Sequence, residues 1–208
     1  LVPYADSEAL GRWLASAADL DTGSKILAVA PLLDTGDKVT RGKAGVRLSV
    51  KGMSILWGCR ADLVLFSFRA GGRCFVAAKE ACEIELRRSP GMAGEPHGIV
   101  LSDSVEIDSK NVREVSAARG PEAVMQRGAL CRSVQMLGAM TRANELTLQY
   151  SRDRKQFRRS LSEFQVIQSY LAAMAGELCA ASGLVQVAIE SVGSDDAFEA
   201  VAAAKIRV

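Results

Sequence analysis

The hydrophobic pattern of this chain changes its period at Gly120, and this change restricts the folds that the sequence can adopt. Before Gly120, short segments such as residues 46–50 alternate apolar and polar side chains. After it, apolar residues recur every three or four positions over residues 121–151 and again over 161–190. A period of two is typical of half-buried strands, and a period near 3.6 is typical of amphipathic helices. The sequence therefore predicts an α+β protein in which a β-region precedes a helical region.

The β-region is expected to be antiparallel. Segments 61–68 and 73–78 flank Ala70-Gly71-Gly72, and a glycine pair between two apolar segments indicates a hairpin. Further strand candidates are residues 25–31, 82–88, 98–103 and 104–108. Several short strands at near-regular spacing predict an antiparallel barrel or sandwich.

Local signals mark the ends of the expected helices. Residues 6–20 have helical spacing of apolar residues, and Pro121 suits the first position of the long helix that follows Gly120. Ser160 and Glu163 form the pattern of a capping box before the next helix. Gly193-Ser194-Asp195 ends that helix, and a third helix follows.

Three regions are expected from these patterns. Residues 1–30 would be the end of an N-terminal helical domain, residues 31–115 a middle β-domain, and residues 116–208 a truncated C-terminal helical bundle.

Composition excludes several classes of function. With 26 basic and 24 acidic residues the net charge is +2, so we expect no nucleic-acid partner. The five cysteines include no C-x-x-C pair and the only histidine is His97, which we expect in a surface loop, so no metal site is predicted. Free thiols suit a reducing, cytoplasmic location. No apolar run reaches the ~18 residues that a membrane span needs, so none is expected.

The most informative motif lies in residues 145–168, ELTLQYSRDRKQFRRSLSEFQVIQ. This segment resembles the signature of the acyl-CoA dehydrogenase family of flavoproteins, in which several residues stand at fixed offsets across a helix, a turn and a second helix. The matching residues are Tyr150, Arg154, Gln156, Phe157, Leu161, Phe164 and Gln165. Residues 28–31 resemble the family's Thr-Glu-Pro strand, and residues 50–66 resemble its β-domain segment that ends in Ala-Asp.

The resemblance implies FAD as the cofactor. An arginine can bind a pyrophosphate bidentately, an aromatic ring can pack against the nucleotide's rings, and glutamine amides can donate and accept hydrogen bonds. The implied cofactor-binding residues are Arg154, Gln156, Phe157, Leu161, Phe164 and Gln165. In the family these groups reach the FAD of a neighbouring subunit, so the resemblance implies a homo- or hetero-oligomer, either a dimer or a tetramer. The other interpretation is a solvated helix end in which Phe157 is a core residue.

The resemblance also implies a reaction, namely the α,β-dehydrogenation of an acyl-CoA thioester in lipid catabolism such as β-oxidation, with electrons passed to an electron-transfer acceptor. Substrate contacts are implied at Met125, Gly128 and Arg132. A carboxylate must remove the α-proton. In the family this glutamate lies either near the C-terminus, which falls beyond Val208, or at the helix position that Gly128 occupies in this chain. The catalytic base is therefore unknown, and Glu122, six residues earlier, would replace it poorly.

Four segments depart from the family pattern. Arg158 replaces a glycine, residues 54–56 replace Trp-Ile-Thr, residues 29–31 lack the polar side chains of Thr-Glu-Pro, and residues 32–37 replace Gly-x-Gly-Ser. The chain also lacks most of the N-terminal domain and part of the C-terminal bundle, as expected of a partial sequence or a shortened subunit. Three functions stay open: a catalytic subunit, a non-catalytic partner that completes the flavin site of a heteromeric acyl-CoA dehydrogenase, and a helical assembly module without flavin.

Overall fold

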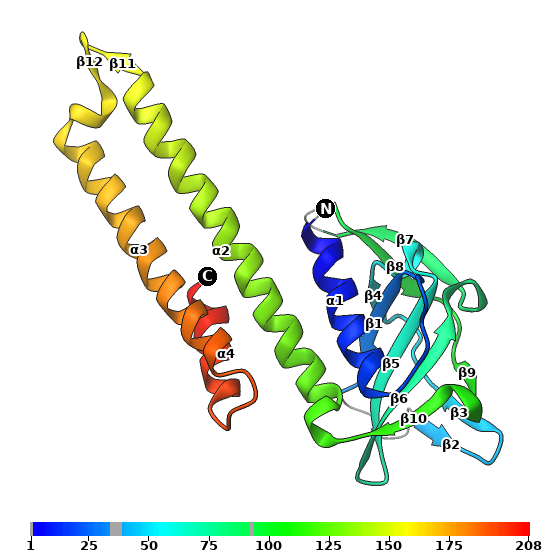
Figure 1. The fold of residues 1–208 in the computed structure, drawn as a ribbon. Helices are drawn as coiled ribbons and strands as arrows, with labels where there is room; N and C mark the ends of the chain where they lie inside the picture. The colour runs from blue at the N-terminus through cyan, green and yellow to red at the C-terminus, as the bar shows by residue number, and fades with distance from the viewer. Residues whose placement is uncertain (1, 34–38, 92–93) are drawn as a thin grey trace. The chain divides into compact units, whose positions relative to one another are not determined.

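A computed structural model describes residues 2–33, 39–91 and 94–208 (Figure 1). The chain forms two compact units, residues 1–128 and residues 129–208. The α+β class is confirmed, whereas the division into residues 1–30, 31–115 and 116–208 stays a prediction. Residues 34–37 of the loop that departs from the family pattern lie outside the described residues.

The first unit contains most of the strands. They are β1 (Leu27–Pro31), β2 (Val39–Arg41), β3 (Gly45–Leu48), β4 (Ser54–Leu56), β5 (Leu63–Ala70), β6 (Arg73–Glu80), β7 (Leu86–Pro90), β8 (Pro96–Val100), β9 (Val105–Asp108) and β10 (Val112–Val115). They form sheets in the orders β1-β5-β6-β10, β2-β3-β9 and β4-β8-β7. Among the described strands, every pair in these sheets is antiparallel except β1 and β5, which run parallel with Leu27 opposite Leu63. The long connection through β2, β3 and β4 allows this exception, because parallel pairing needs a crossover that a short turn cannot provide.

One strand prediction was wrong, and two strands of the first unit were not predicted. The segment 82–88 is not one strand: a 3-10 turn covers Ala81–Glu83, and β7 begins only at Leu86. Strands β2 and β10 were not predicted. The sequence VREV of β10 has two adjacent polar residues and therefore no alternation, and β2 has only three residues.

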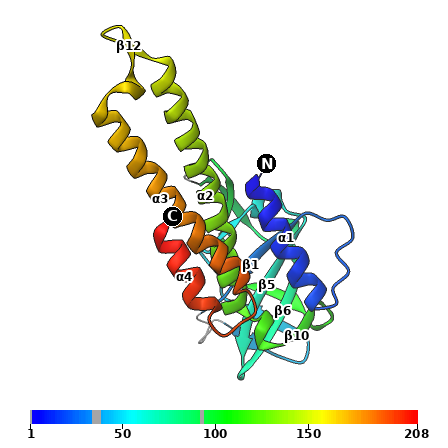
Figure 2. The same ribbon diagram turned by 60° about the vertical axis from the view of Figure 1, so that its left-hand side comes forward.

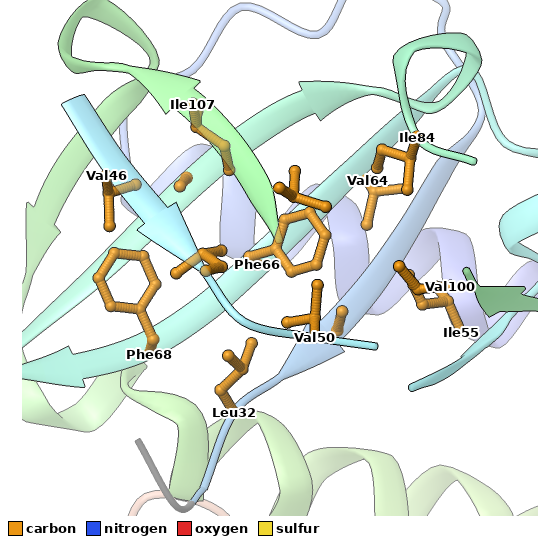
Figure 3. Packing of buried hydrophobic residues seen from close by; sticks show 14 of the residues in the cluster. Leu32, Val46, Val50, Ile55, Val64, Phe66, Phe68, Ile84, Val100 and Ile107 are labelled. Carbon is orange, nitrogen blue, oxygen red and sulfur yellow. The ribbon is translucent and has the colours of Figure 1, made fainter. Parts of the chain in front are cut away.

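Strand β5 is buried on both faces. Val64, Phe66 and Phe68 point to one side, where they join the main core cluster together with residues of all three sheets (Figure 3). Leu63 and Leu65 point to the other side, where helix α1 (Val2–Ala17) covers the sheet (Figure 1). Because consecutive strand residues face opposite sides, a continuous apolar run is required here in place of an alternating one.

Two polar contacts fix the edges of this arrangement. The carboxylate of Asp62 accepts a hydrogen bond from the Ile26 N–H at 2.8 Å, which joins the start of β1 to the start of β5. The guanidinium groups of Arg119 and Arg127 each lie 4.3 Å from the centre of the Trp13 ring on α1. A cation over an aromatic face is attractive, so these contacts hold α1 against the start of the long helix α2 and the segment before it.

The second unit consists of helices joined by a short hairpin. Helix α2 (Pro121–Asp153) begins in the first unit and continues into the second, where α3 (Gln165–Glu190) runs back alongside it and α4 (Ala197–Arg207) packs on α3 (Figure 2). The small core of this unit is formed by Val185, Ala188, Val201 and Ala204, with Ala129, Leu130 and Leu137 of α2 packed against it. The two long helices therefore lie where the period of 3.6 predicted them.

Helix α3 is long and apolar enough, by length and composition alone, to cross a membrane. Its mean hydropathy over an 18-residue window is 1.5, and only 17% of that window is buried. Its sequence has no uninterrupted apolar run, which is why no membrane span was expected. A subunit interface requires the same kind of surface, so this helix alone is weak support for a membrane span, and the absence of a span stays a prediction.

Candidate functional site

A short hairpin between α2 and α3 carries the motif. Strands β11 (Lys155–Gln156) and β12 (Arg159–Ser160) pair in antiparallel fashion, with Gln156 opposite Arg159. The two residues between them, Phe157 and Arg158, have φ angles of 51° and 64°. Positive φ at both central residues is the geometry of a type I′ hairpin turn. The sequence predicted only a polar break here, because strands of two residues show no periodicity.

Backbone and hydroxyl contacts fix the base of this hairpin. The Leu161 N–H donates to the Arg154 carbonyl oxygen at 2.9 Å. The Ser160 Oγ lies 2.9 Å and 3.0 Å from the carbonyl oxygens of Ser151 and Arg152, at the end of α2 where carbonyl groups lack helical partners. The predicted capping box is present, with the Ser160 N–H donating to Glu163 Oε1 at 3.1 Å. The hairpin is therefore attached to both helices at its base.

The predicted cofactor-binding residues divide into two groups. Arg154, Gln156, Phe157 and Gln165 are exposed, whereas Leu161 and Phe164 are half-buried. The ring of Phe157 is 89% exposed, so the alternative in which it belongs to the core is wrong. The Arg159 guanidinium lies 4.0 Å from the centre of the Phe164 ring and covers that side chain. The structure thus places Phe157 at the tip of the hairpin and uses Phe164 to support its base.

Positive charge accumulates at this hairpin. Within residues 152–159 five side chains are basic, namely Arg152, Arg154, Lys155, Arg158 and Arg159, while Asp153 is the one acid. In the part of the chain that the structure describes, none of the five forms an ion pair. The first turn of α3 lies next to them, and its cap residue Phe164 offers no side-chain acceptor to the free N–H groups. Exposed cations beside a helix N-terminus form a site that favours an anion.

The predicted substrate residues lie along α2. Met125 is 46% exposed, and Gly128 and Arg132 are half-buried. A β-carbon added to Gly128 would meet only Leu10 Cδ2, at 3.9 Å, so the helix has room for a side chain at this position. The Arg132 guanidinium donates to Gln135 Oε1 at 2.9 Å. No arrangement of a substrate follows from these contacts, and the three assignments stay predictions.

Glu122 is held by an arginine. Its Oε2 lies 2.9 Å from Arg69 Nη2, and the hydrogen bond from Arg69 lowers the pKa of the Glu122 carboxyl below its ordinary value. A general base is most effective when its pKa lies near the working pH. The ion pair with Arg69 moves the pKa of Glu122 away from that range. The structure therefore agrees with the expectation that Glu122 would replace a catalytic glutamate poorly.

Strands β1 and β4, which the resemblance places at flavin-facing segments, present few polar side chains. In β1, Ala30 belongs to the main core cluster and Val29 packs against the cluster beneath α1. In β4, Ile55 is fully buried, and the following Trp57 has a φ of 63° with its N–H donating to the Pro96 carbonyl at 2.8 Å. These segments fill the core of the β-domain and present few side chains that could form hydrogen bonds with a flavin ring.

His97 is not in a loop. It lies in strand β8, where its Nδ1 is 2.9 Å from the hydroxyl of Ser54 on β4. The neighbouring prolines and glycines had suggested a loop, but Pro96 occupies the first position of a strand, where a missing N–H is tolerated.

Comparison with known proteins agrees with this geometry. Residues 121–208 match the family described as acyl-CoA dehydrogenase, C-terminal domain. No curated protein sequence matches the chain. Similar solved structures include the ChsE4-ChsE5 complex from Mycobacterium tuberculosis, with a TM-score of 0.80, 20% identity, and coverage of 99% of this chain and 60% of that chain.

Two further structures show the same fold. Glutaryl-CoA dehydrogenase from Mycobacterium smegmatis has a TM-score of 0.78 at 18% identity, with coverage of 99% of this chain and 60% of that chain. An FAD-dependent dehydrogenase has a TM-score of 0.77 at 19% identity, with coverage of 99% and 64%. The chain thus spans less than two thirds of the length of these proteins. It has the acyl-CoA dehydrogenase fold, and its residues 121–208 match the acyl-CoA dehydrogenase C-terminal domain family.

Proposed function

We propose that this chain is a subunit of an FAD-dependent acyl-CoA dehydrogenase and that its hairpin, residues 154–160, binds the pyrophosphate of an FAD held mainly by a neighbouring subunit. The observation that carries this proposal is the combination of an 89% exposed Phe157 with cations that form no ion pair within the described part of the chain. A solvated helix end does not require an exposed aromatic ring, because that ring would be stabilised by burial. An aromatic surface beside cations suits a molecule that has both rings and phosphates.

The residues of the hairpin fit this cofactor. Arg154 would hold a phosphate oxygen pair, Gln156 would exchange hydrogen bonds with the nucleotide, and Phe157 would pack against its rings. When bound, FAD would accept the hydride that leaves the substrate's β-carbon. The protein residues would provide binding and orientation, which is the usual division of roles in cofactor enzymes.

The β-domain supports a narrower version of the same proposal, in which this chain binds FAD for a neighbour but is not catalytic itself. Val29 and Ala30 contribute packing where the family has polar side chains, Gly128 has no carboxylate, and Glu122 is paired with Arg69. A chain with these features could complete a neighbour's flavin site without performing the reaction itself. The alternative function is therefore a non-catalytic structural partner in a heteromeric acyl-CoA dehydrogenase. The ChsE4-ChsE5 structure, which is a complex, supports this version by similarity of fold.

An oligomer follows from the proposal, because the hairpin would act on a cofactor outside its own chain. Large apolar side chains are exposed on the helices of the second unit, namely Val134, Leu146, Tyr150, Val166, Tyr170, Val187, Ile189, Phe198 and Ile206. Exposed apolar surface of this extent is typical of interfaces. We propose a dimer or tetramer with a related subunit, built on α2 and α3.

The substrate, the electron acceptor, the pathway and the location are proposed only by class. The substrate would be an acyl-CoA thioester, the electrons would pass to an electron-transfer acceptor, and the pathway would be lipid catabolism such as β-oxidation. A cytoplasmic location agrees with an odd number of cysteines without a paired motif.

An electron-acceptor-linked assay distinguishes the two versions. The full chain would be purified alone and together with a co-expressed related subunit that carries an intact flavin pocket and a glutamate. We expect little or no dehydrogenation of acyl-CoA thioesters by the chain alone and turnover by the pair, without restoring a glutamate at Gly128, because one carboxylate per site is sufficient. Full turnover by the chain alone would exclude the partner version. No flavin binding in either preparation would exclude both versions.

A further inference from the structure

We infer that Arg158 is a second phosphate-binding residue of the hairpin and that it acts with Arg154 on a diphosphate group. The inference rests on the proposed function, because it assigns a further residue to the same flavin site. The family pattern has a glycine at this position, so the similarity to the family does not provide the assignment. It depends on the backbone conformation and the surroundings of Arg158 in this chain.

The backbone at Arg158 is unfavourable for an arginine. Its φ of 64° lies in the left-handed region, where the β-carbon of any residue other than glycine crowds the following carbonyl oxygen. The preceding Phe157, at 51°, has the same problem. Both central positions of a type I′ turn normally hold glycine, asparagine or aspartate for this reason. The hairpin therefore carries two adjacent strained residues.

Contacts within the chain do not offset this strain. The side chain of Arg158 is exposed, and among the residues that the structure describes it has no ion pair and no side-chain hydrogen bond. Its neighbour Arg159 differs, because it lies 4.0 Å over the Phe164 ring and so has a structural role. A strained residue without internal contacts is a candidate for contact with a ligand, since strain of this kind is concentrated at functional sites.

The charge of the hairpin indicates the ligand. Arg154 immediately precedes β11 and Arg158 lies in the turn, so two arginines flank Phe157 along the sequence. A dinucleotide contains two linked phosphates, each with one negative charge. One guanidinium for each phosphate would balance that charge, and each could form paired N–H···O bonds. Figure 1 shows the hairpin at the far end of the second unit from α4.

The test uses the full chain in complex with the co-expressed related subunit, and it separates FAD binding from backbone strain. FAD would be titrated onto the wild type and onto R158G, R158K and R154A while flavin fluorescence is followed, and the melting temperature of each variant would be measured. R142A is the control, because Arg142 is an exposed arginine of α2 paired with Glu145 outside the hairpin. We expect R158G to melt about 2–4 °C higher, since glycine relieves the strain, yet to bind FAD about tenfold more weakly. R158K should retain most of the affinity, and R142A should match the wild type.

The outcomes are separable. If R158G is more stable and binds FAD as tightly as the wild type, this inference is overturned. If R154A nevertheless binds FAD more weakly than the wild type, the proposed function stands. Wild-type affinity for FAD in both R154A and R158G, or no FAD binding by the wild-type complex, would contradict the proposed function as well. If R142A loses as much FAD affinity as R158G, the loss reflects the net charge of the chain and not a contact of Arg158. This outcome would also overturn the inference.

Discussion

The guanidinium of Arg159 lies 4.0 Å from the centre of the Phe164 ring, so the second strand of the hairpin is attached to the residue that precedes α3. The next residue, Ser160, joins the same strand to the carbonyl groups at the end of α2. These contacts fix a two-residue turn that is unfavourable in isolation, with Phe157 and Arg158 at positive φ. The chain thus holds an exposed, basic tip in one conformation, which reduces the entropy lost when a ligand binds.

The substitution R159A tests this attachment. Removal of a cation–π contact at an exposed site costs about 0.5–1 kcal/mol, so the hairpin should open more often. Amide hydrogen exchange at Leu161, whose N–H donates to Arg154, should become about two- to fivefold faster, and R159K should preserve part of the protection. Unchanged exchange in R159A would show that Ser160 alone is sufficient to hold the hairpin.

The ion pair between Arg69 and Glu122 gives the first unit a stability that depends on pH. The pKa of Glu122 is lowered in the folded state, chiefly by the hydrogen bond from Arg69. A carboxyl group with a lowered pKa stabilises the fold above its unfolded pKa, and this stabilisation is lost as the pH falls through the folded pKa. Wild type should therefore be more stable than E122Q at pH 7, and the difference should close in the acid range below the ordinary glutamate pKa.

Urea unfolding of both proteins between pH 7 and pH 3 measures this difference. Because both side chains are partly exposed, the gain should be small, about 0.2–1 kcal/mol. The variant R69Q should lose the same stability at pH 7, and the double variant should lose little more. A stability difference between wild type and E122Q that grows toward acid pH would contradict the stabilising role of the ionised Glu122 carboxylate.

The exposed apolar surface of α3 predicts association. Tyr170 is 63% exposed in the middle of the first half of this helix, so Y170E should weaken an oligomer by placing a charge in its interface. The neighbouring S169E is the matched control, because Ser169 is also exposed but contributes little apolar area. Size-exclusion chromatography with light scattering would measure both. A monomeric wild type at micromolar concentration would exclude the oligomer.

The sequence predicted the architecture well where periodicity was strong. Residues 121–151 and 161–190 gave the long helices, and the glycine pair at residues 71–72 gave the β5–β6 hairpin. Periodicity could not show that β1 pairs in parallel with β5, because pairing direction depends on a long connection and not on the strand's own residues. It also gave no signal for the hairpin of residues 155–160, which depends on contacts with two helix ends.

The candidate site was predictable only in part. The motif located Arg154 and Phe157, yet only the fold shows that Phe157 is exposed whereas Phe164 supports the hairpin. In the sequence, Arg158 was a departure from the family's glycine. Its positive φ makes it a candidate ligand residue, and backbone angles of this kind cannot be derived from composition or spacing.

Flavin content after purification of R154A tests the central claim, which is that this hairpin binds FAD through the guanidinium of Arg154. The variant and the wild type would each be isolated with the co-expressed related subunit, and flavin absorbance per mole of complex would be measured. Charge-assisted hydrogen bonds are worth about 1.5–3 kcal/mol, so R154A should bind FAD about ten- to hundredfold more weakly and should lose most of its flavin on dilution. R142A should retain the wild-type content, since Arg142 is paired with Glu145 on α2. Equal flavin content in R154A and the wild type would contradict the claim.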